Sequence, residues 1–338
     1  MPTSTSTRST RSAGLAVALS AALLAGCGSD EPDSARAADA DGFPVTVSSC
    51  GHEATVPAPP ERAVTINQGA TEVLLALGLA DRMVGTAYLD DEVSDRWADE
   101  YASVPVLSAE YPDTETLLTA EPDFVYGSYL TSFAGDAAGS QADLADLGIP
   151  SYVSPFGCGR DTPGESAGAD GVTFDDVWGE LRDMASVFGV AERAEELVAE
   201  QQELLADPAI ATAGEGLTVF WYDSGDTTPF AGVGEGGPQL LLDSVGATNL
   251  FADVPGTWAD VSWERVVEAD PDVIVLPEAT WSTVEEKKRY LAADPALSAL
   301  TAVREERYVE LPFTESTPGV RNADGVVSLA EQLTALGR

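Results

Sequence analysis

Basic side chains are scarce in this sequence. Its 338 residues include one histidine, His52, and two lysines, Lys287 and Lys288. A single histidine nearly excludes histidine-rich zinc or manganese sites and weakens most acid–base triads. With 17 basic against 57 acidic residues, the formal net charge is −40, which argues against binding a nucleic-acid backbone or a polybasic contact with a membrane. The sequence also lacks a paired-cysteine zinc motif and a phosphate loop.

Long apolar runs are equally scarce. The run from Ala13 to Ala25 is too short to cross ~30 Å of hydrocarbon as a helix, but it suits the core of a signal peptide after Arg8 and Arg11. It ends in Leu24-Ala25-Gly26-Cys27, which resembles a bacterial lipobox, so Cys27 is expected to carry lipid. We therefore predict a signal peptide (1–26), a flexible lipidated tether (27–42) and a body anchored at the extracytoplasmic face of the cell membrane. The alternative is an ordinary cleaved signal peptide with an incidental cysteine.

Two cysteines, Cys50 and Cys158, remain in the body. An even number in an oxidising compartment predicts a disulfide, and two buried free thiols are the alternative.

The body alternates short apolar strands with helices, which predicts βαβ units and mostly parallel sheets. Its length favours two domains. We expect an N-terminal α/β lobe (43–173), a helical segment (174–211) with one break near Gly189, and a C-terminal α/β lobe (212–338). The helical segment includes a long polar helix, Ala191 to Ala206, that joins the lobes. In the first lobe, a helix is expected from Asp136 to Leu147.

A repeat relates the two halves. Glu115 opens a short helix seven residues before Pro122-Asp123 and a buried strand, and Glu264 stands in the same relation to Pro271-Asp272. Generic helix–turn–strand sequence could produce each copy alone. Identical offsets in both halves favour two related lobes with matching surface glutamates.

The body resembles the substrate-binding lipoproteins of bacterial ABC importers for iron–siderophores, haem and cobalamin. The resemblance runs from Phe43 to the C-terminus and rests on the order and spacing of six segments: Arg62-Ala-Val-Thr-Ile66, Thr71-Glu-Val-Leu-Leu-Ala-Leu-Gly78, Arg82-Met-Val-Gly85, Pro271-Asp-Val-Ile-Val275, Leu300-Thr-Ala-Val-Arg304 and Arg307-Tyr-Val309. It implies two Rossmann-like α/β lobes bridged by a single long helix, the class III periplasmic binding protein fold. It also implies a monomer that is not an enzyme and has no resident cofactor, metal or nucleic acid, and whose lobes close by a small rigid-body movement.

In that family, one glutamate of each lobe docks into arginine pockets of a permease dimer. The repeat assigns this docking to Glu115 and Glu264. Within the family, the sequence is most similar to a subgroup proposed to carry a deazaflavin coenzyme precursor, factor 420-zero. That similarity rests on these stretches: Cys50-Gly51, Ser154-Pro155 with Cys158, Trp221-Tyr-Asp-Ser-Gly-Asp226, Thr257-Trp258, Ala279-Thr-Trp281 and Val320-Arg-Asn322. A ferric siderophore, haem or cobalamin is the alternative ligand.

Ligands of open α/β sheets bind beyond the carboxyl ends of the strands, so residues that follow the strands are the candidates. In the first lobe they are Asn67, Gln68, Tyr88, Ser128, Tyr129, Phe156 and Arg160. In the second they are Trp221, Tyr222, Asp226, Trp258, Trp281, Phe313 and Arg321. The aromatic residues suit a flat conjugated ring, and Arg160 or Arg321 could pair with a phosphate or carboxylate. Packing under a loop, or a surface salt bridge for Arg321, is the structural alternative.

Gly232-Val-Gly-Glu-Gly-Gly237 fits the dinucleotide pattern G-x-G-x-x-G, but several residues separate it from the strand expected to end near Tyr222. We therefore expect a cleft loop that leads into a helix at Pro238. Two other classes stay open, namely an extracellular hydrolase that uses carboxylate pairs and a lipid-anchored scaffold protein.

Overall fold

The computed structural model describes residues 42–135, 137–158, 171–317 and 319–337 of the chain. The predicted signal peptide, the lipidation site Cys27, the tether up to residue 41 and Arg160 lie outside the described residues. The first lobe contains β1 Val45–Ser49, β2 His52–Val56, β3 Ala63–Ile66, α1 Gln68–Ala76, η2 Ala80–Arg82, β4 Met83–Ala87, η3 Asp95–Trp97, α2 Ala98–Tyr101, β5 Val106–Ser108, α3 Thr114–Thr119, β6 Phe124–Gly127, η4 Leu130–Phe133, α4 Gln141–Asp146, β7 Ser151–Val153 and η5 Pro155–Gly157.

The remaining elements are helices α5 to α7 and the second lobe. They are α5 Phe174–Phe188, α6 Ala191–Leu205, α7 Pro208–Ala211, β8 Thr218–Ser224, β9 Phe230–Gly232, α8 Gly237–Ser244, β10 Thr248–Asn249, β11 Trp258–Asp260, α9 Trp263–Ala269, β12 Val273–Glu278, α10 Val284–Ala293, η6 Leu297–Ala299, α11 Thr301–Arg304, β13 Tyr308–Pro312, η7 Phe313–Ser316 and α12 Asn322–Leu336.

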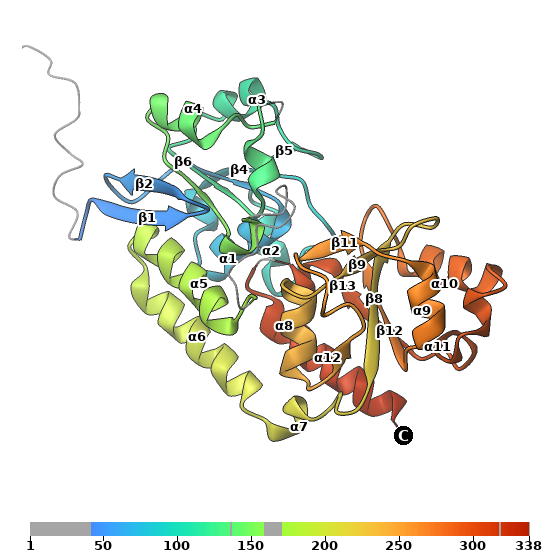
Figure 1. Ribbon diagram of the computed structural model, residues 1–338. Coiled ribbons are helices and arrows are strands. Elements are labelled where there is room, and N and C mark those ends of the chain that lie inside the picture. The colour runs from blue at the N-terminus through green and yellow to red at the C-terminus, as the bar shows by residue number, and fades with distance from the viewer. Residues whose placement is uncertain (1–41, 136, 159–170, 318, 338) are drawn as a thin grey trace, which may run out of the picture. The chain divides into compact units, whose positions relative to one another are not determined.

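The sheet of the first lobe is parallel throughout, in the order β5-β4-β3-β6-β7. Strands β3, β6 and β7 are buried on both faces, as strands of βαβ units are, whereas the edge strand β5 is partly exposed. One face packs against α1, α5 and α6, and the other packs against α3 and α4. The hairpin β1–β2 forms a separate two-stranded sheet (Figure 1).

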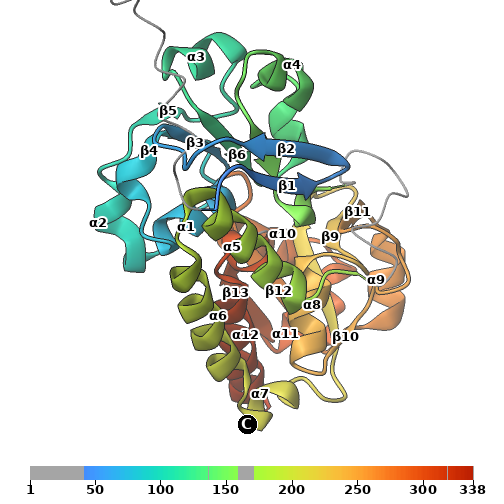
Figure 2. The ribbon, with the colours of Figure 1, turned by 90° about the vertical axis from the view of Figure 1, so that its left-hand side faces the viewer.

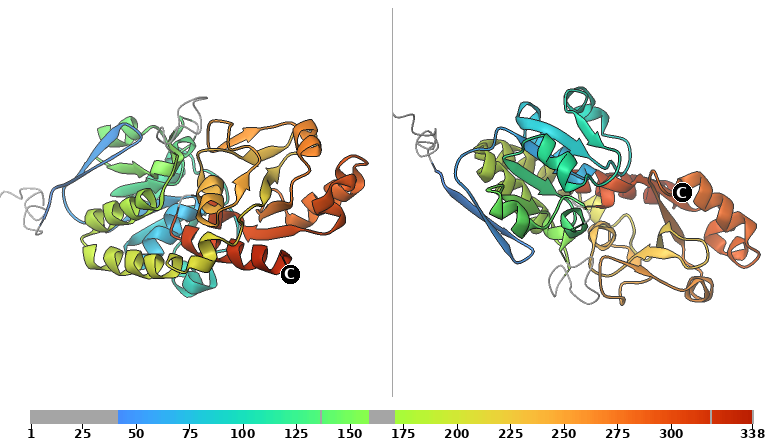
Figure 3. Two further views of the ribbon diagram at one scale, coloured as in Figure 1. Left: turned by 60° about the horizontal axis from the view of Figure 1, so that its bottom comes forward. Right: turned by 90° about the horizontal axis from the view of Figure 1, so that it is seen from above.

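The sheet of the second lobe is mixed. Strands β8, β10, β12 and β13 run parallel, whereas β9 pairs antiparallel with β8 and β11 pairs antiparallel with β9. The sequence reasoning missed β9, β10 and β11. Alternate residues of β8 face opposite sides: Val219 and Trp221 pack under α8 and α12, and Phe220 and Tyr222 pack in the cluster of α9 and α10. The C-terminal helix α12 lies beside α8 on the first of these faces (Figure 3).

The helical segment contains two helices of 15 residues each, broken where the sequence predicted. Gly189 ends α5 in the left-handed region at φ 70°, which glycine adopts without a steric penalty. The two helices lie side by side, and α6 also contacts α12 of the second lobe (Figures 1 and 2).

The helix expected from Asp136 to Leu147 is shorter than predicted. It begins at Gln141, because Ser140 forms a capping box with Asp143. Gly139, one residue before the cap, has φ 89° and therefore lies outside helical geometry. Asp136 itself lies outside the described residues.

The repeat corresponds to equivalent structure in both lobes. Glu121 and Asp270, which precede the two prolines, both adopt positive φ, at 48° and 43°. The Asp123 carboxylate accepts hydrogen bonds from the amides of Glu61 and Arg62 just before β3, and the Asp272 carboxylate accepts one from Thr218 at the start of β8. Asp123, just before β6, thus fixes the start of the neighbouring strand β3. Asp272, just before β12, fixes the start of the neighbouring strand β8 in the same way.

A buried carboxylate lies under the first sheet. Glu180 of α5 is 1% exposed and accepts a hydrogen bond from the Tyr126 hydroxyl, while one of its oxygens has no hydrogen-bond partner. Burial raises the pKa of Glu180 to about 7, although the bond from Tyr126 opposes the rise. Because the folded-state pKa exceeds the ordinary value, the group destabilises the fold progressively as pH rises from about 4.5 to 7.

We expect Glu180→Gln to raise the free energy of unfolding at pH 8 by about 1 to 2 kcal/mol. Removing the ionisation would contribute up to about 3 kcal/mol, and an unpaired buried amide would offset about 1 kcal/mol. At pH 5, where most of the native Glu180 is protonated, the gain should vanish. Urea unfolding at both pH values measures this, with Glu192→Gln at an exposed position of α6 as the control. An equal gain at pH 5 and pH 8 would contradict the buried ionisation.

Candidate functional site

A cavity of about 360 Å³ is lined by both lobes. Its lining residues come from segments at the ends of strands, which is where open α/β sheets bind ligands. They are Asn67, Tyr88, Asp90, Tyr111, Tyr129 and Thr131 of the first lobe and Asp223, Ser224, Phe230, Trp281 and Phe313 of the second. This cavity is the candidate ligand site.

Two residues of the first lobe lie in unusual backbone conformations. Asn67 and Tyr88 directly follow β3 and β4, with φ of 71° and 57°. Such values are uncommon for residues with a side chain and concentrate at functional sites. The Asn67 amide donates to the Ala87 carbonyl at 3.0 Å, and its side-chain oxygen accepts from the Ser132 hydroxyl at 3.0 Å. These bonds hold Asn67 at the base of the cavity.

Aromatic rings form walls on both sides of the cavity. In the first lobe, Tyr88 stacks on Tyr111 with ring centroids 4.7 Å apart. In the second, Trp281 meets Phe313 edge to face at 4.8 Å, and Trp281 is 44% exposed. Trp258 stacks on the far side of Phe313 at 5.7 Å and so supports that wall. Stacked and edge-on rings of this kind can enclose a flat ring of a ligand.

A buried lysine supports the second wall from below. The Lys287 ammonium of α10 donates to the backbone carbonyls of Pro277 and Ser282, next to Trp281. Burial lowers the pKa of Lys287 to about 8, and the nearby Asp223 carboxylate opposes the shift. Asp223 also accepts a hydrogen bond of 2.9 Å from the Ser224 hydroxyl. These contacts fix the turn that presents Trp281 to the cavity.

The structure places the predicted ligand residues in three groups. Five of them line the cavity, and Trp258 packs behind it. The five are Asn67, Tyr88, Tyr129, Trp281 and Phe313. Tyr222 and Asp226 instead line a neighbouring cavity of about 660 Å³, which shares Ser224 and Trp281 with the first.

The remaining described candidates have structural partners. Ser128 accepts a hydrogen bond from the Ala70 amide and thereby holds the start of α1. Gln68 bonds the Glu72 side chain and the Asp91 amide within the first lobe. Phe156 packs with Val177 and Leu240, and Trp221 lies in the core of the second sheet. The guanidinium of Arg321 lies in a buried ionic cluster outside the cavity.

Sequence reasoning missed six lining residues. Asp90 and Tyr111 each stand three residues beyond the ends of β4 and β5, and Asp223 and Ser224 belong to β8, which extends two residues further than predicted. Thr131 lies in η4, and Phe230 begins the unpredicted strand β9. A search window that extended four residues beyond each expected strand would have found Asp90 and Tyr111.

The glycine-rich segment is a packing feature. Contrary to the sequence analysis, β9 ends at Gly232, so a strand does precede the motif directly. However, the amides of Gly234 and Glu235 donate to the carbonyls of Val254 and Gly256. A Cβ at Gly237 would lie 2.1 Å from the Ser316 carbonyl oxygen. These two amides are therefore engaged within the lobe and cannot hold a phosphate.

The two repeat glutamates occupy equivalent exposed positions. Asp113 and Ser262 are the N-caps of α3 and α9, and Glu115 and Glu264 each follow two residues later. The Ser262 hydroxyl donates to the Glu264 carboxylate at 2.7 Å and lowers its pKa. Negative charge in the first helical turn is favoured by the helix dipole.

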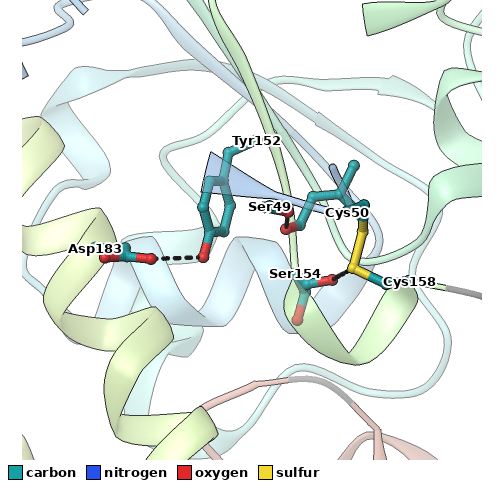
Figure 4. The surroundings of a disulfide bond; sticks show 7 residues. Ser49, Cys50, Tyr152, Ser154, Cys158 and Asp183 are labelled. Carbon is teal, nitrogen blue, oxygen red and sulfur yellow. Dashed lines mark hydrogen bonds between the residues drawn. A yellow bond between two sulfur atoms is a disulfide. The ribbon is translucent and has the colours of Figure 1, made fainter. Parts of the chain in front are cut away.

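A disulfide joins Cys50 and Cys158, as the cysteine count predicted (Figure 4). It links the turn of the β1–β2 hairpin to the loop after β7. Gly157 in that loop packs so tightly that a Cβ would lie 2.7 Å from the Cα of Tyr129, a cavity residue. The disulfide therefore anchors a loop that supports the cavity wall.

Within the described ranges, no group of three or more His, Cys, Asp or Glu residues is placed to hold a metal ion. Among the same residues, no helix combines the length and apolar character needed to cross a membrane.

Comparison with known proteins agrees with this arrangement. A family model described as periplasmic binding protein matches residues 64–315. An uncharacterized ABC transporter substrate-binding lipoprotein of Bacillus subtilis, YvrC, is 25% identical over 94% of this chain and 95% of its own length. A vitamin B12-binding protein of Vibrio parahaemolyticus is 22% identical over 64% of this chain and 70% of its own length.

Solved structures of periplasmic binding and transport proteins also match this chain. A periplasmic binding protein from Veillonella parvula is 28% identical with a TM-score of 0.75, and the match covers 86% of this chain and 97% of that one. A structure described as an ABC-type Fe3+-hydroxamate transport system from Saccharomonospora viridis is 26% identical with a TM-score of 0.72, covering 86% and 99%. Because the family model matches well over half of the chain, this protein belongs to the periplasmic binding protein family.

Proposed function

We propose that the protein is the extracytoplasmic solute-binding lipoprotein of an ABC importer. In this proposal it captures a small ring-containing ligand between its lobes and delivers it to a permease dimer. The observation that carries the proposal is the cavity whose aromatic walls, Tyr88–Tyr111 and Trp281–Phe313, come from different lobes. A ligand held by both walls links the lobes, which gives the permease a liganded state to recognise.

The size and chemistry of the cavity support a ligand with several rings. Its volume of about 360 Å³, together with the adjoining chamber of about 660 Å³ beyond Trp281, is compatible with a ligand of several rings. The deazaflavin precursor is our proposed ligand, and a ferric siderophore, haem or cobalamin is the alternative within the same family. Arg160, predicted to pair with an anionic group of the ligand, lies outside the described residues, so that contact stays a prediction.

Native mass spectrometry of the protein purified from its own host tests the proposal directly. Thermal shift assays then use four probes: the deazaflavin precursor, a ferric hydroxamate, haem and cyanocobalamin. A probe at a hundred times its dissociation constant should stabilise the fold by about 2.7 kcal/mol. A shift with one probe supports solute binding and identifies the ligand class. No co-purified molecule and no shift with any probe would contradict solute binding.

The walls of the cavity give a second test. We expect Trp281→Leu and Tyr111→Leu each to raise the dissociation constant of the stabilising probe about tenfold, because the loss of a ring contact is worth about 1.4 kcal/mol at the upper end of aromatic pairs. Tyr101→Leu in α2, away from the cavity, is the control and should leave affinity unchanged. Isothermal titration calorimetry measures all three. Unchanged affinity in both wall variants would place the ligand elsewhere.

A further inference from the structure

The lobes are joined by a polar contact beside the cavity. The Thr280 amide of the second lobe donates to the Asp90 carbonyl of the first at 3.0 Å. The Thr314 amide donates to the Asp91 carboxylate at 2.8 Å. These two backbone amides therefore report directly whether the lobes are in contact.

A buried ionic cluster continues the same contact. The Arg321 guanidinium of the second lobe is 7% exposed and lies 3.6 Å from both the Glu72 and the Asp91 carboxylates of the first. It also lies 3.4 Å from Glu315 of its own lobe. One guanidinium thus faces three carboxylates, so the cluster carries two excess negative charges when all of them are ionised.

The carboxylates of the cluster have oxygen atoms that can bind a proton. One carboxylate oxygen in each of Glu72, Asp91 and Glu315 is buried without a hydrogen-bond donor. Burial raises the pKa of Glu315 to about 7 and raises those of Glu72 and Asp91, while Arg321 opposes each rise. A cavity of about 540 Å³, lined by Asp91 and Arg321, reaches the cluster and gives water access to it.

The surrounding charges do not neutralise the cluster. The charged residues of the elements around it are Glu72 of α1, Asp90, Asp91 and Glu92 of the segment after β4, Asp95 and Arg96 of η3, Glu278 of β12, Glu315 of η7, and Asp324 with Arg321 near the start of α12. Arg96 is the other cation in this set, and it pairs with Glu200 at 3.1 Å. Asp324 adds a further negative charge near Glu315.

We propose that Arg321, Glu72, Asp91 and Glu315 form a proton-dependent latch between the two lobes. When the lobes are in contact, burial makes the carboxylates bind a proton, which they release when the lobes separate and the carboxylates become fully solvated. Proton binding and lobe contact therefore favour each other: the contact is favoured below about pH 7 and weakens as pH rises through that value. The latch needs no ligand and holds whichever solute the cavity binds.

Hydrogen exchange of the Thr280 and Thr314 amides tests the latch in the full chain without ligand. After correction for intrinsic exchange, protection at these amides should fall roughly thirtyfold between pH 5.5 and 8.5, as a single proton with the shift of Glu315 predicts. The Ile274 amide, bonded to the Arg307 carbonyl inside the second sheet, is the internal reference. Its protection should not show this fall between pH 5.5 and 8.5.

Glu315→Gln separates a latch from a general effect of pH. Glutamine still accepts from Arg321 but cannot ionise, so protection at both amides should stay high up to pH 8.5. Glu331→Gln, the same change at an exposed position of α12, should behave as the unmodified protein does. The proposal is overturned if protection at the two amides changes with pH no more than protection at Ile274 does. It is also overturned if the Glu315→Gln variant keeps the original pH dependence.

Discussion

Replacing both Glu115 and Glu264 by arginine is expected to abolish uptake while ligand affinity changes by less than about twofold. Both carboxylates are exposed at the same position of equivalent short helices, α3 and α9. If they dock into arginine pockets of a permease, reversal turns two attractions into two repulsions, and like charges placed opposite each other cost several kcal/mol. Neither residue lines the cavity, so binding should survive.

Uptake of the identified ligand by the importer, reconstituted in vesicles, measures this effect. Each single variant should lose about tenfold or more in rate. Glu110→Arg and Glu268→Arg are the matched controls, because they are exposed glutamates near the two docking positions. Uptake that persists in the double variant would refute docking through these glutamates, whereas a loss of ligand binding would show that the substitution had disturbed the fold.

The alternation of strands and helices was predictable because local sequence determines it. Buried parallel strands appear as short apolar runs, and each helix end carries its own signal, such as Gly189. The repeat was predictable for the same reason: Pro122 and Pro271 follow residues in the left-handed conformation, and the aspartate after each proline bonds a neighbouring strand. These features require little knowledge of distant contacts.

The missed elements depend on distant contacts. Strands β9 and β11 are short, and they form because β9 pairs with β8 and β11 pairs with β9. The extra strand also changed the context of the glycine motif, whose amides are engaged by residues about 20 positions away. No local pattern in the segment specifies these partners.

The candidate site was partly predictable. The aromatic walls were largely found, since they follow strands, although Tyr111 was missed. The prediction failed to distinguish cavity residues from core residues where side chains alternate along a strand: Trp221 packs under α8 and α12, whereas Asp223 and Ser224 further along β8 reach the cavity. Arg321 could not be assigned from sequence, because the carboxylates around it come from segments more than 200 residues apart.

Removing the disulfide is expected to lower the free energy of unfolding by about 4 to 5 kcal/mol. The two cysteines are 108 residues apart, and in the chain-entropy model a cross-link that closes a loop of this length stabilises by that amount. Near the disulfide, the Ser49 hydroxyl also donates a hydrogen bond to the Val153 carbonyl. The loss would be a large fraction of the stability typical of a domain.

Urea unfolding of the Cys50→Ala/Cys158→Ala variant measures the loss, and the unmodified protein under a reductant provides the control because it keeps both side chains. If chain entropy dominates, the two should unfold at similar urea concentrations. A loss below about 1 kcal/mol would show that the native contacts hold the hairpin without the bond. Since Gly157 beside Cys158 packs against Tyr129, the same variant should also bind its ligand more weakly, which ties the disulfide to the cavity wall as well as to the fold.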